Sequence, residues 1–471
     1  MNRPVLSTLT VLSVLAAGCM VGPAYKQPPV LQPDGFKSQE ANADAPPIAP
    51  DWWRLYREPE LDRLVVMANE SNQALKQAVA AVDQARALAR VAGSYRYPTL
   101  SLDPSVARQR TSATRDGNVT GQPVGSSATF NDWLVPVDLA YEIDVWGRIR
   151  RSLESARAQA VASADDEATV RLVVQTDVGQ YYYALRSLDA QSDILAQTVL
   201  SYREQVRLLS AQLGSGLVSA VVVHQAEAQL ESTLAQRRDV QRARADQEHA
   251  LAILCGQPAP SFAVAVNPLR ETSPPDVPPG LPAALLARRP DVASAEQRVV
   301  AANAQIGVAK ADFYPRFSLA SAAGYESANL STLFDWRSRI ASIIPGVSLP
   351  IFQGGRLKSN LNAARAQYRQ TVAAYVNQVL IAYSDVEDAL TDLHALIDMV
   401  ASYRTAVGAS QNYLRLAQVQ YKTGLADYLL VTDAERTLLA NQLSLAQTVN
   451  LQQAASIRLI KALGGGWQDR P

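Results

Sequence analysis

The residue types that most often carry out chemistry are few in this sequence, and their spacing does not fit a reaction. The chain of 471 residues has three histidines, His224, His249 and His394, and no two of them lie four residues apart, as metal ligands on a helix usually do. Gly464–Gly466 follows a predicted helix, so it indicates a helix terminus and not a phosphate-binding loop. No nucleophile is spaced from a base as in a catalytic motif. We therefore expect a protein that is not an enzyme and holds no metal and no cofactor.

Charged residues are balanced, with 44 lysines and arginines against 44 aspartates and glutamates. Nucleic-acid binding is therefore disfavoured, because no basic excess is available to neutralise phosphates. The acidic run Asp165–Glu167 is interpreted as a solvated or pore-facing helix surface. Since no group couples an energy source to movement, any transport through this chain would be passive.

The N-terminus has the features of an export signal. Arg3 precedes an apolar run, Val5–Ala17, that is too short to span a bilayer, so residues 1–18 are predicted to be a signal peptide. The next residue, Cys19, follows Ala17-Gly18 as in a bacterial lipoprotein processing site, and it would then carry covalent lipid such as palmitate. Ordinary cleavage beside an incidental cysteine is the alternative. The other cysteine, Cys255, would have no disulfide partner and is expected to be buried.

One long helix is predicted to organise the chain. Arg148–Leu213 has no proline and one glycine, Gly179, and a proline inside a helix would remove a hydrogen bond and cause a clash. Its apolar residues recur in steps of four and three, which indicates helices packed side by side. At about 1.5 Å per residue this helix would be roughly 100 Å long and would need neighbours along its length. The recurring residues are Val174, Val178, Tyr181, Leu185, Leu188, Leu195, Val199, Tyr202, Val206, Leu209 and Leu213.

The second half of the chain repeats the pattern of the first. Gly216-Leu217 corresponds to Gly424-Leu425, and Gln225-Ala226-Glu227 to Asp433-Ala434-Glu435, because 424 minus 216 and 433 minus 225 both equal 208. An internal two-fold structural repeat thus accounts for most of the chain. The resulting division is a signal peptide (1–18), an acylated extended segment (19–59), a first repeat (60–257), a proline-rich connector (258–284), a second repeat (285–467) and a C-terminal tail (468–471).

Each repeat is predicted to contain two strands as well as helices. Trp133–Ile143 alternates apolar and polar residues and has aromatic residues near its ends, which fits a lipid-facing barrel strand. One half-buried strand of a soluble sheet is the alternative. The predicted strands are residues 98–107, 133–143, 315–325 and 340–351. The other predicted helices are 61–89, a return helix ending at 254, 356–423 and 427–463.

Four strands per chain limit the kind of sheet that can cross a membrane. Open sheet edges cannot be satisfied in lipid, so a membrane sheet must close. About eight strands are the practical minimum for a barrel, so several chains would have to share one. Dimers would give eight strands and a filled interior, whereas trimers would give twelve and room for a channel.

Several motifs, taken together and in order, resemble those of the TolC-like outer-membrane efflux proteins, in their lipoprotein branch of OprM type. The resemblance covers essentially all of the mature chain. It implies a mainly α protein with a small β part, in which a trimeric α-helical coiled-coil barrel is continued by a shared twelve-stranded transmembrane β-barrel, four strands per chain. Met20, where an aspartate would resemble an inner-membrane retention signal, agrees with an outer-membrane location. The motifs are Cys19–Tyr25, Pro28, Trp52-Trp53, Glu60-Leu61, Leu286–Asp291, Leu349–Phe352 and Gly464–Trp467.

The resemblance also implies a function and partners. The chain would passively conduct drugs or other small toxic compounds to the outside. It would receive them from a periplasmic adaptor (membrane fusion) protein and an inner-membrane pump of the resistance-nodulation-division type. One alternative is a lipid-anchored periplasmic coiled-coil structural protein, which leaves the two strand pairs unexplained. Another is a secretion or metal-export channel of the same family.

Two groups of site residues are expected around the helix turns. By resemblance, a gate lies at Leu429, Asp433 and Tyr421, and the first two are four residues apart on one helix face. An ion pair between Asp433 and Arg436 is the alternative. Family members often bond the matching tyrosine to an aspartate, but Val222 stands there in this chain, so packing around Leu429 would matter more. The adaptor contact is expected at the two turns, and the alternative is that their glycines only form the turns. The expected contact residues are Gly214, Gly216, Leu217, Ser219, Gly424, Leu425 and Ala426.

Overall fold

A computed structural model describes residues 20–37, 48–113, 127, 129–270, 272–277 and 288–467. The predicted signal peptide, Cys19 and the C-terminal tail lie outside these ranges. The chain divides into two compact units. The first unit comprises Met1–Pro28, Asp83–Ala162 and Ala295–Ala374, and the second comprises Pro29–Val82, Ser163–Ser294 and Tyr375–Pro471.

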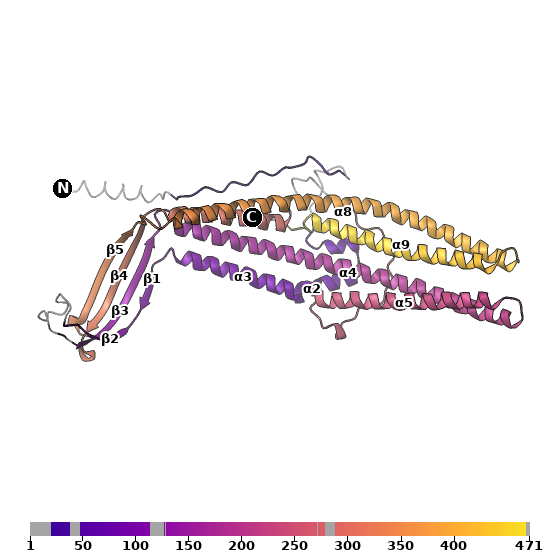
Figure 1. Ribbon diagram of the computed structural model, residues 1–471, viewed down its shortest axis with the longest axis horizontal. Helices are drawn as coiled ribbons and strands as arrows, with labels where there is room; N and C mark the ends of the chain where they lie inside the picture. Colours follow the sequence, from indigo (N-terminus) through magenta and orange to yellow (C-terminus); the bar gives the residue numbers. More distant parts are fainter. Residues whose placement is uncertain are drawn as a thin grey trace. The chain divides into compact units, whose positions relative to one another are not determined.

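Two long helices and two return helices make up most of the structure. The long helices α4 (Arg148–Gly214) and α8 (Arg356–Lys422) each have 67 residues, and the return helices α5 (Ala220–Leu254) and α9 (Tyr428–Ala462) each have 35. Within the second unit, α5 runs back along α4 and α9 runs back along α8 (Figure 1). The predicted bounds of these helices are confirmed to within a few residues, because proline-free stretches with a 3.5-residue apolar repeat leave few alternatives.

Among the described helices, none combines the length and the apolar character that crossing a membrane requires.

The helix predicted over residues 61–89 is instead two helices, α2 (Pro59–Ser71) and α3 (Gln73–Ser94). The break is at Asn72, whose backbone is extended and whose side-chain Oδ1 accepts a hydrogen bond from the Leu75 amide at 3.0 Å. Its Nδ2 donates to the Leu254 carbonyl at 2.9 Å, at the end of α5. Asn72 therefore caps α3 and ties it to the return helix, which the apolar periodicity could not show. A further helix, α7 (Pro290–Ala311), lies in the second half of the chain.

Five strands in the first unit form one antiparallel sheet, in the order β1-β3-β4-β5 with β2 also paired to β3 (Figure 1). The first predicted strand is interrupted at Asp103-Pro104, because proline has no amide hydrogen to donate, yet its register against β3 is unchanged across the gap. The last strand ends at Ser348, three residues earlier than predicted, just before Leu349-Pro350. The bounds are β1 Thr99–Leu102, β2 Ser105–Arg110, β3 Thr129–Ile143, β4 Arg316–Ser327 and β5 Arg339–Ser348.

The two faces of this sheet differ in chemistry. Residues directly opposite one another in an antiparallel pair share a face, so the register assigns every side chain to one of two faces. The face that includes Val137 is mostly apolar, and its apolar residues are exposed or half-buried in the single chain: Ile343, for example, is 75% exposed. The opposite face is mostly small or polar, with Ser101, Asp138 and Ser318 among its residues. The apolar face carries Leu100, Leu102, Val106, Trp133, Val135, Val137, Leu139, Tyr141, Phe317, Leu319, Ala323, Tyr325, Ile343 and Val347.

The segment before α2 lies along other parts of the chain, as predicted for a proline-rich extended stretch. In the first unit, the Val21 amide donates to the Trp146 carbonyl at 3.0 Å, and the Tyr25 hydroxyl donates to Glu296 at 2.8 Å. In the second unit the segment is not extended throughout, because Trp52–Tyr56 forms a short 3₁₀ helix, η1, whose Trp52 is fully buried. Other 3₁₀ turns are η2 (Ala259–Ser261), η3 (Leu330–Thr332) and η4 (Trp336–Ser338).

The acidic run Asp165–Glu167 on α4 is not a solvated surface, so that part of its interpretation is wrong. Asp165 is buried. Asp166 accepts a hydrogen bond from the Ser294 hydroxyl at 2.6 Å, and Glu167 forms an ion pair with Arg171 at 2.6 Å. The sequence shows a charge run but not its partners, and Ser294 is far away along the chain.

Cys255 is buried, as predicted, and its Sγ lies 3.7 Å from the Leu64 carbonyl oxygen. Burial raises the pKa of its thiol to about 11, so it stays protonated and unreactive at neutral pH.

Candidate functional site: the helix turns and the contact between hairpins

The two helix turns of the second unit have the same backbone. The Leu217 amide donates to the Gln212 carbonyl and the Gly216 amide to the Leu213 carbonyl; the Leu425 and Gly424 amides repeat this pattern one repeat later. This pair of bonds is a Schellman motif, which needs a left-handed residue after the helix. Gly216 and Gly424 supply it, each with φ of 74°. The turn-forming role of these two glycines is therefore established by geometry.

The residues predicted to contact an adaptor lie on the surface of these turns. A Cβ placed on Gly214, Gly216 or Gly424 would meet no atom within 4 Å. Leu217 and Leu425 are 75% and 81% exposed. Ser219 precedes α5 and is exposed, whereas Ala426 is half-buried. The turns thus present apolar side chains and open backbone together.

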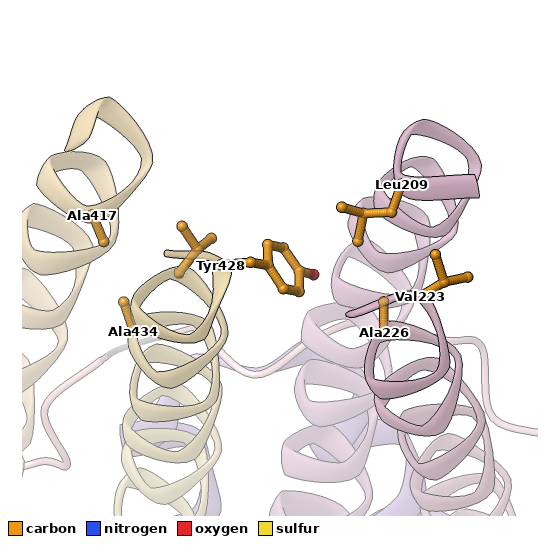
Figure 2. Close-up of a cluster of buried hydrophobic side chains, with 7 residues drawn as sticks. Leu209, Val223, Ala226, Ala417, Tyr428 and Ala434 are labelled. Carbon is orange, nitrogen blue, oxygen red and sulfur yellow. The ribbon is translucent and has the colours of Figure 1, made fainter. Parts of the chain in front are cut away.

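Just below the turns, a cluster of buried apolar residues joins the α4–α5 hairpin to the α8–α9 hairpin (Figure 2). In Figure 2 the Tyr428 ring extends from α9 toward Leu209 of α4. Tyr421 and Val222 are half-buried against the same cluster, and the Tyr421 ring packs edge-on against Tyr428 at 5.7 Å between centroids. Apolar packing therefore holds Tyr421 and Val222 at the contact between the hairpins. The cluster is Leu209, Val223, Ala226, Ala417, Tyr428, Val431 and Ala434.

A polar chain crosses between the same two hairpins. The Tyr428 hydroxyl donates to Gln205 Oε1 at 2.7 Å, and Gln205 Nε2 donates to Glu435 Oε1. Glu435 is 8% exposed, and this burial raises the pKa of its carboxyl to about 7, against a smaller opposite effect of the Gln205 bond. Burial also raises the pKa of Tyr428 to about 12. Gln205 therefore links a tyrosine and a buried carboxyl across the hairpin contact.

Of the three residues predicted to form a gate, Leu429 and Asp433 lie on one side of α9, whereas Tyr421 lies near the end of α8. Leu429 is 57% exposed in the single chain. Asp433 is exposed and accepts a hydrogen bond from the Tyr413 hydroxyl at 3.0 Å. Among the described residues it forms no ion pair with Arg436, so that alternative is wrong. The side chains of Leu429 and Asp433 are therefore both exposed on this side of α9.

Three residues of this region were missed by the sequence analysis: Gln205, Tyr413 and Glu435. The signal for Glu435 was present, because Gln225-Ala226-Glu227 and Asp433-Ala434-Glu435 had been matched as repeats, but nothing in the match said that only one glutamate is buried. Gln205 lies 223 and 230 residues along the chain from its partners Tyr428 and Glu435, and Tyr413 lies 20 residues before Asp433, across the turn between α8 and α9. In the described part of the chain, no group of three or more histidine, cysteine or acidic side chains could hold a metal ion.

Comparison with known proteins agrees with this architecture. The family model described as "Outer membrane efflux protein" matches residues 64–257 and 281–465. The chain is 33% identical over 463 residues to the solvent efflux pump outer membrane protein SrpC of Pseudomonas putida, covering 96% of this chain and 97% of that protein. It is 30% identical over 468 residues to the probable outer membrane lipoprotein SilC of Salmonella typhimurium, covering 98% of each.

Two further likenesses concern cation efflux and the solved structures. The cation efflux system protein CusC of Escherichia coli is 29% identical over 463 residues, covering 97% of this chain and 98% of that protein. The crystal structure of the Campylobacter jejuni CmeC outer membrane channel superposes with a TM-score of 0.89 at 25% identity, covering 96% of each chain. The sequence, the helices and the sheet thus lead to one conclusion: this chain belongs to the outer membrane efflux protein family.

Proposed function

We propose that this protein is one of three identical subunits of an outer-membrane channel that conducts small compounds passively out of the cell. The observation that carries the proposal is the sheet of the first unit, which has one exposed apolar face and two free edges. Within the described residues, β5 pairs only with β4, and β1 and β2 pair only with β3. If strands of neighbouring chains pair with the free edges, the backbone groups there gain hydrogen-bond partners and the sheet closes. The exposed apolar face would then contact lipid.

The proposed subunit number follows from barrel geometry. The interrupted strand β1–β2 and the strands β3, β4 and β5 occupy four positions across the sheet. Three copies would give twelve strands, which leaves room for a channel, whereas two copies would give about eight and a filled interior. The equal lengths of α4 and α8, and of α5 and α9, support the internal repeat and a pseudo-symmetric helical wall built from three chains.

We assign the energy for transport to partners and not to this chain. The proposed partners are a periplasmic adaptor and an inner-membrane pump of the resistance-nodulation-division type. The exposed turn residues Leu217 and Leu425, with the turn glycines around them, are proposed as the adaptor contact. Leu429, Asp433 and Tyr421 are proposed as the gate, where a ring of leucines would exclude water and a ring of carboxylates would attract cations. No reaction, metal or cofactor is part of this proposal.

Anchoring by a lipid on Cys19 is proposed in addition to the barrel. The observation in favour is the run Ala17-Gly18-Cys19 at the end of the predicted signal peptide. The likeness to the probable lipoprotein SilC agrees with it.

The compound class is proposed as drugs or other small toxic organic molecules, in line with the likeness to SrpC. Cation export is the second candidate, because CusC covers almost the whole chain at similar identity. The described residues hold no metal-ligand cluster, so a cation would be conducted and not stored. A coiled-coil structural protein is disfavoured because it would not need an apolar sheet face.

The proposal is tested in two steps. Chemical crosslinking and native mass measurement of the detergent-solubilised protein should give a ladder that ends at three; a ladder that ends at two, or a monomer, would contradict the shared barrel. Expression with its own pump and adaptor in a strain that lacks an outer-membrane channel should restore resistance to organic drugs. Restored resistance to metal ions alone would favour the cation candidate.

A further inference from the structure

Glu435 is a buried carboxyl to which the proposed channel function gives no role. It lies on α9 at the contact with α4, and its Oε1 accepts a hydrogen bond from Gln205. Its Oε2 is buried and has no hydrogen-bond partner within the described parts of the chain. A buried carboxylate with one oxygen unsatisfied is costly, whereas the protonated group gives up much less hydration when it is buried. The packed arrangement of the hairpins therefore prefers the protonated form.

The groups around Glu435 do not neutralise its charge. From α4, Tyr202 is buried beside it, and burial raises the pKa of Tyr202 to about 12, so it remains neutral. From α9, Tyr428 is neutral for the same reason, and Arg436 is exposed. No ion pair to Glu435 forms among the described side chains.

Two titratable groups of the other helices near the turns have partners of their own. From α5, His224 and Glu227 pair with each other at 2.9 Å. From α8, the hydroxyl of Tyr413 is bonded to Asp433. Glu435 is thus a carboxyl held between hairpins without an ion-pair partner among the described residues.

The internal repeat provides a comparison within the same chain. Glu227 occupies the position on α5 that Glu435 occupies on α9, because 435 minus 227 is again 208. Its side chain is 49% exposed and bonded to His224. The same residue type at the matching position is therefore solvated in the first hairpin and buried only in the second. Burial is a property of the contact that Glu435 makes with α4, and not of the repeated motif.

We propose that the α4–α5 and α8–α9 hairpins close on each other near their turns in a proton-dependent way, with the Glu435 carboxyl as the group that takes up the proton. Separating the hairpins would break the chain from Tyr428 through Gln205 to Glu435 and would expose the carboxyl to water. Once exposed, the carboxyl ionises more readily, so separation releases a proton. This inference rests on the proposed function in one respect: it assumes that the channel is closed when the two hairpins are packed together.

The direction of the pH dependence follows from this linkage. In the packed arrangement burial raises the pKa of Glu435 to about 7, whereas its ordinary value is 4.5. Below about pH 4.5 the carboxyl is protonated in both arrangements and packing is most favourable. Between 4.5 and 7 packing weakens as pH rises, and above 7 it no longer changes. A pKa difference of this size corresponds to a change of up to roughly three hundredfold in the equilibrium between packed and separated hairpins.

The test measures the distance between the two turns in the purified full-length protein. Leu217→Cys and Leu425→Cys, one exposed residue on each turn, are spin-labelled, and labelled protein is assembled with an excess of unlabelled protein so that few trimers carry two labelled chains. Cys255 is buried with a raised pKa, so it does not take the label. Pulsed electron paramagnetic resonance then measures the distances between the two labels at pH 5 and pH 8. The ratio of long to short distances should be roughly tenfold or more higher at pH 8 than at pH 5.

Three variants make the result specific. Glu435→Gln keeps the shape but cannot ionise, so its distances should match the pH 5 distribution at both pH values. Gln205→Ala removes the bond that favours the ionised form, so its transition should move to higher pH. Glu227→Gln, the matched substitution in the first hairpin, should behave like the unsubstituted protein. The proposal is overturned if the unsubstituted protein shows no pH dependence, or if the dependence persists in Glu435→Gln. Drug resistance is not the readout, so failure here leaves the channel proposal standing.

Discussion

The Tyr413 hydroxyl donates a hydrogen bond to the Asp433 carboxylate at 3.0 Å, which ties the exposed acidic residue of α9 to the neighbouring helix α8. The bond holds the carboxylate in place without neutralising it, because a tyrosine adds no positive charge. It also raises the pKa of Tyr413, so the hydroxyl remains a donor. Asp433 can therefore act as a fixed negative charge on this side of α9.

We expect Asp433→Asn to reduce cation selectivity in planar bilayers, because three carboxylates would be lost from the proposed ring. Tyr413→Phe removes the hydrogen bond but keeps the charge, so selectivity should remain close to that of the unsubstituted channel. Reversal potentials in a salt gradient measure both. Equal losses in the two variants would show that the contact, and not the charge, sets selectivity.

Leu429→Ala should increase single-channel conductance, because three large apolar side chains would leave the proposed constriction. Val221 is the matched control: it occupies the equivalent position in the first hairpin, since 429 minus 221 is 208, and it is 74% exposed. Val221→Ala should leave conductance unchanged. If Leu429→Ala does the same in correctly assembled trimers, Leu429 does not form the constriction.

Cysteines introduced at Ser219 and Ala426 should crosslink to the adaptor in cells, because both residues lie in the turns proposed to dock it. Arg242→Cys is a suitable control, since it is exposed on α5 but lies about 30 Å along the helix from the turn. Crosslinks are detected as shifted bands after immunoblotting. Normal expression with no crosslink at either turn residue would place the adaptor elsewhere.

Cys19→Ser should abolish incorporation of labelled palmitate if Cys19 is the acylated residue. The protein should still reach the outer membrane, because a closed barrel inserts without a lipid anchor. Metabolic labelling followed by membrane fractionation measures both outcomes. Label that persists in the variant would rule out acylation at this residue.

Gly179→Ala should lower the thermal unfolding midpoint of the protein. A Cβ at residue 179 would lie 2.9 Å from Ile457 Cδ1 and 3.6 Å from the Trp52 ring. Overpacking of this kind costs about 1–3 kcal/mol. Gly408→Ala is the control on α8, where a Cβ would meet nothing within 4 Å, and there alanine should be neutral or slightly stabilising because it favours the helix.

The helices were predictable from the sequence because their signals are local. The absence of proline between Arg148 and Leu213 and the steps of four and three residues select a long packed helix, and the turn glycines mark where it ends. The sheet was nearly as predictable, since alternation along a strand depends only on the backbone period of two. The interruption at Pro104 divides the first predicted strand into β1 and β2, but the sheet keeps four positions because the register against β3 continues across the gap.

The tertiary structure decided what each exceptional residue is for, because that depends on partners far away in the chain. Gly179 allows Ile457 and Trp52 to pack closely against α4. Asn72 breaks a helix that the apolar periodicity predicted to be continuous. Glu227 and Glu435 are the same residue type at matching positions of a repeat, yet one is solvated and the other buried. A repeat sets which face of its own helix a side chain occupies, but the element packed against that face sets its burial and therefore its charge.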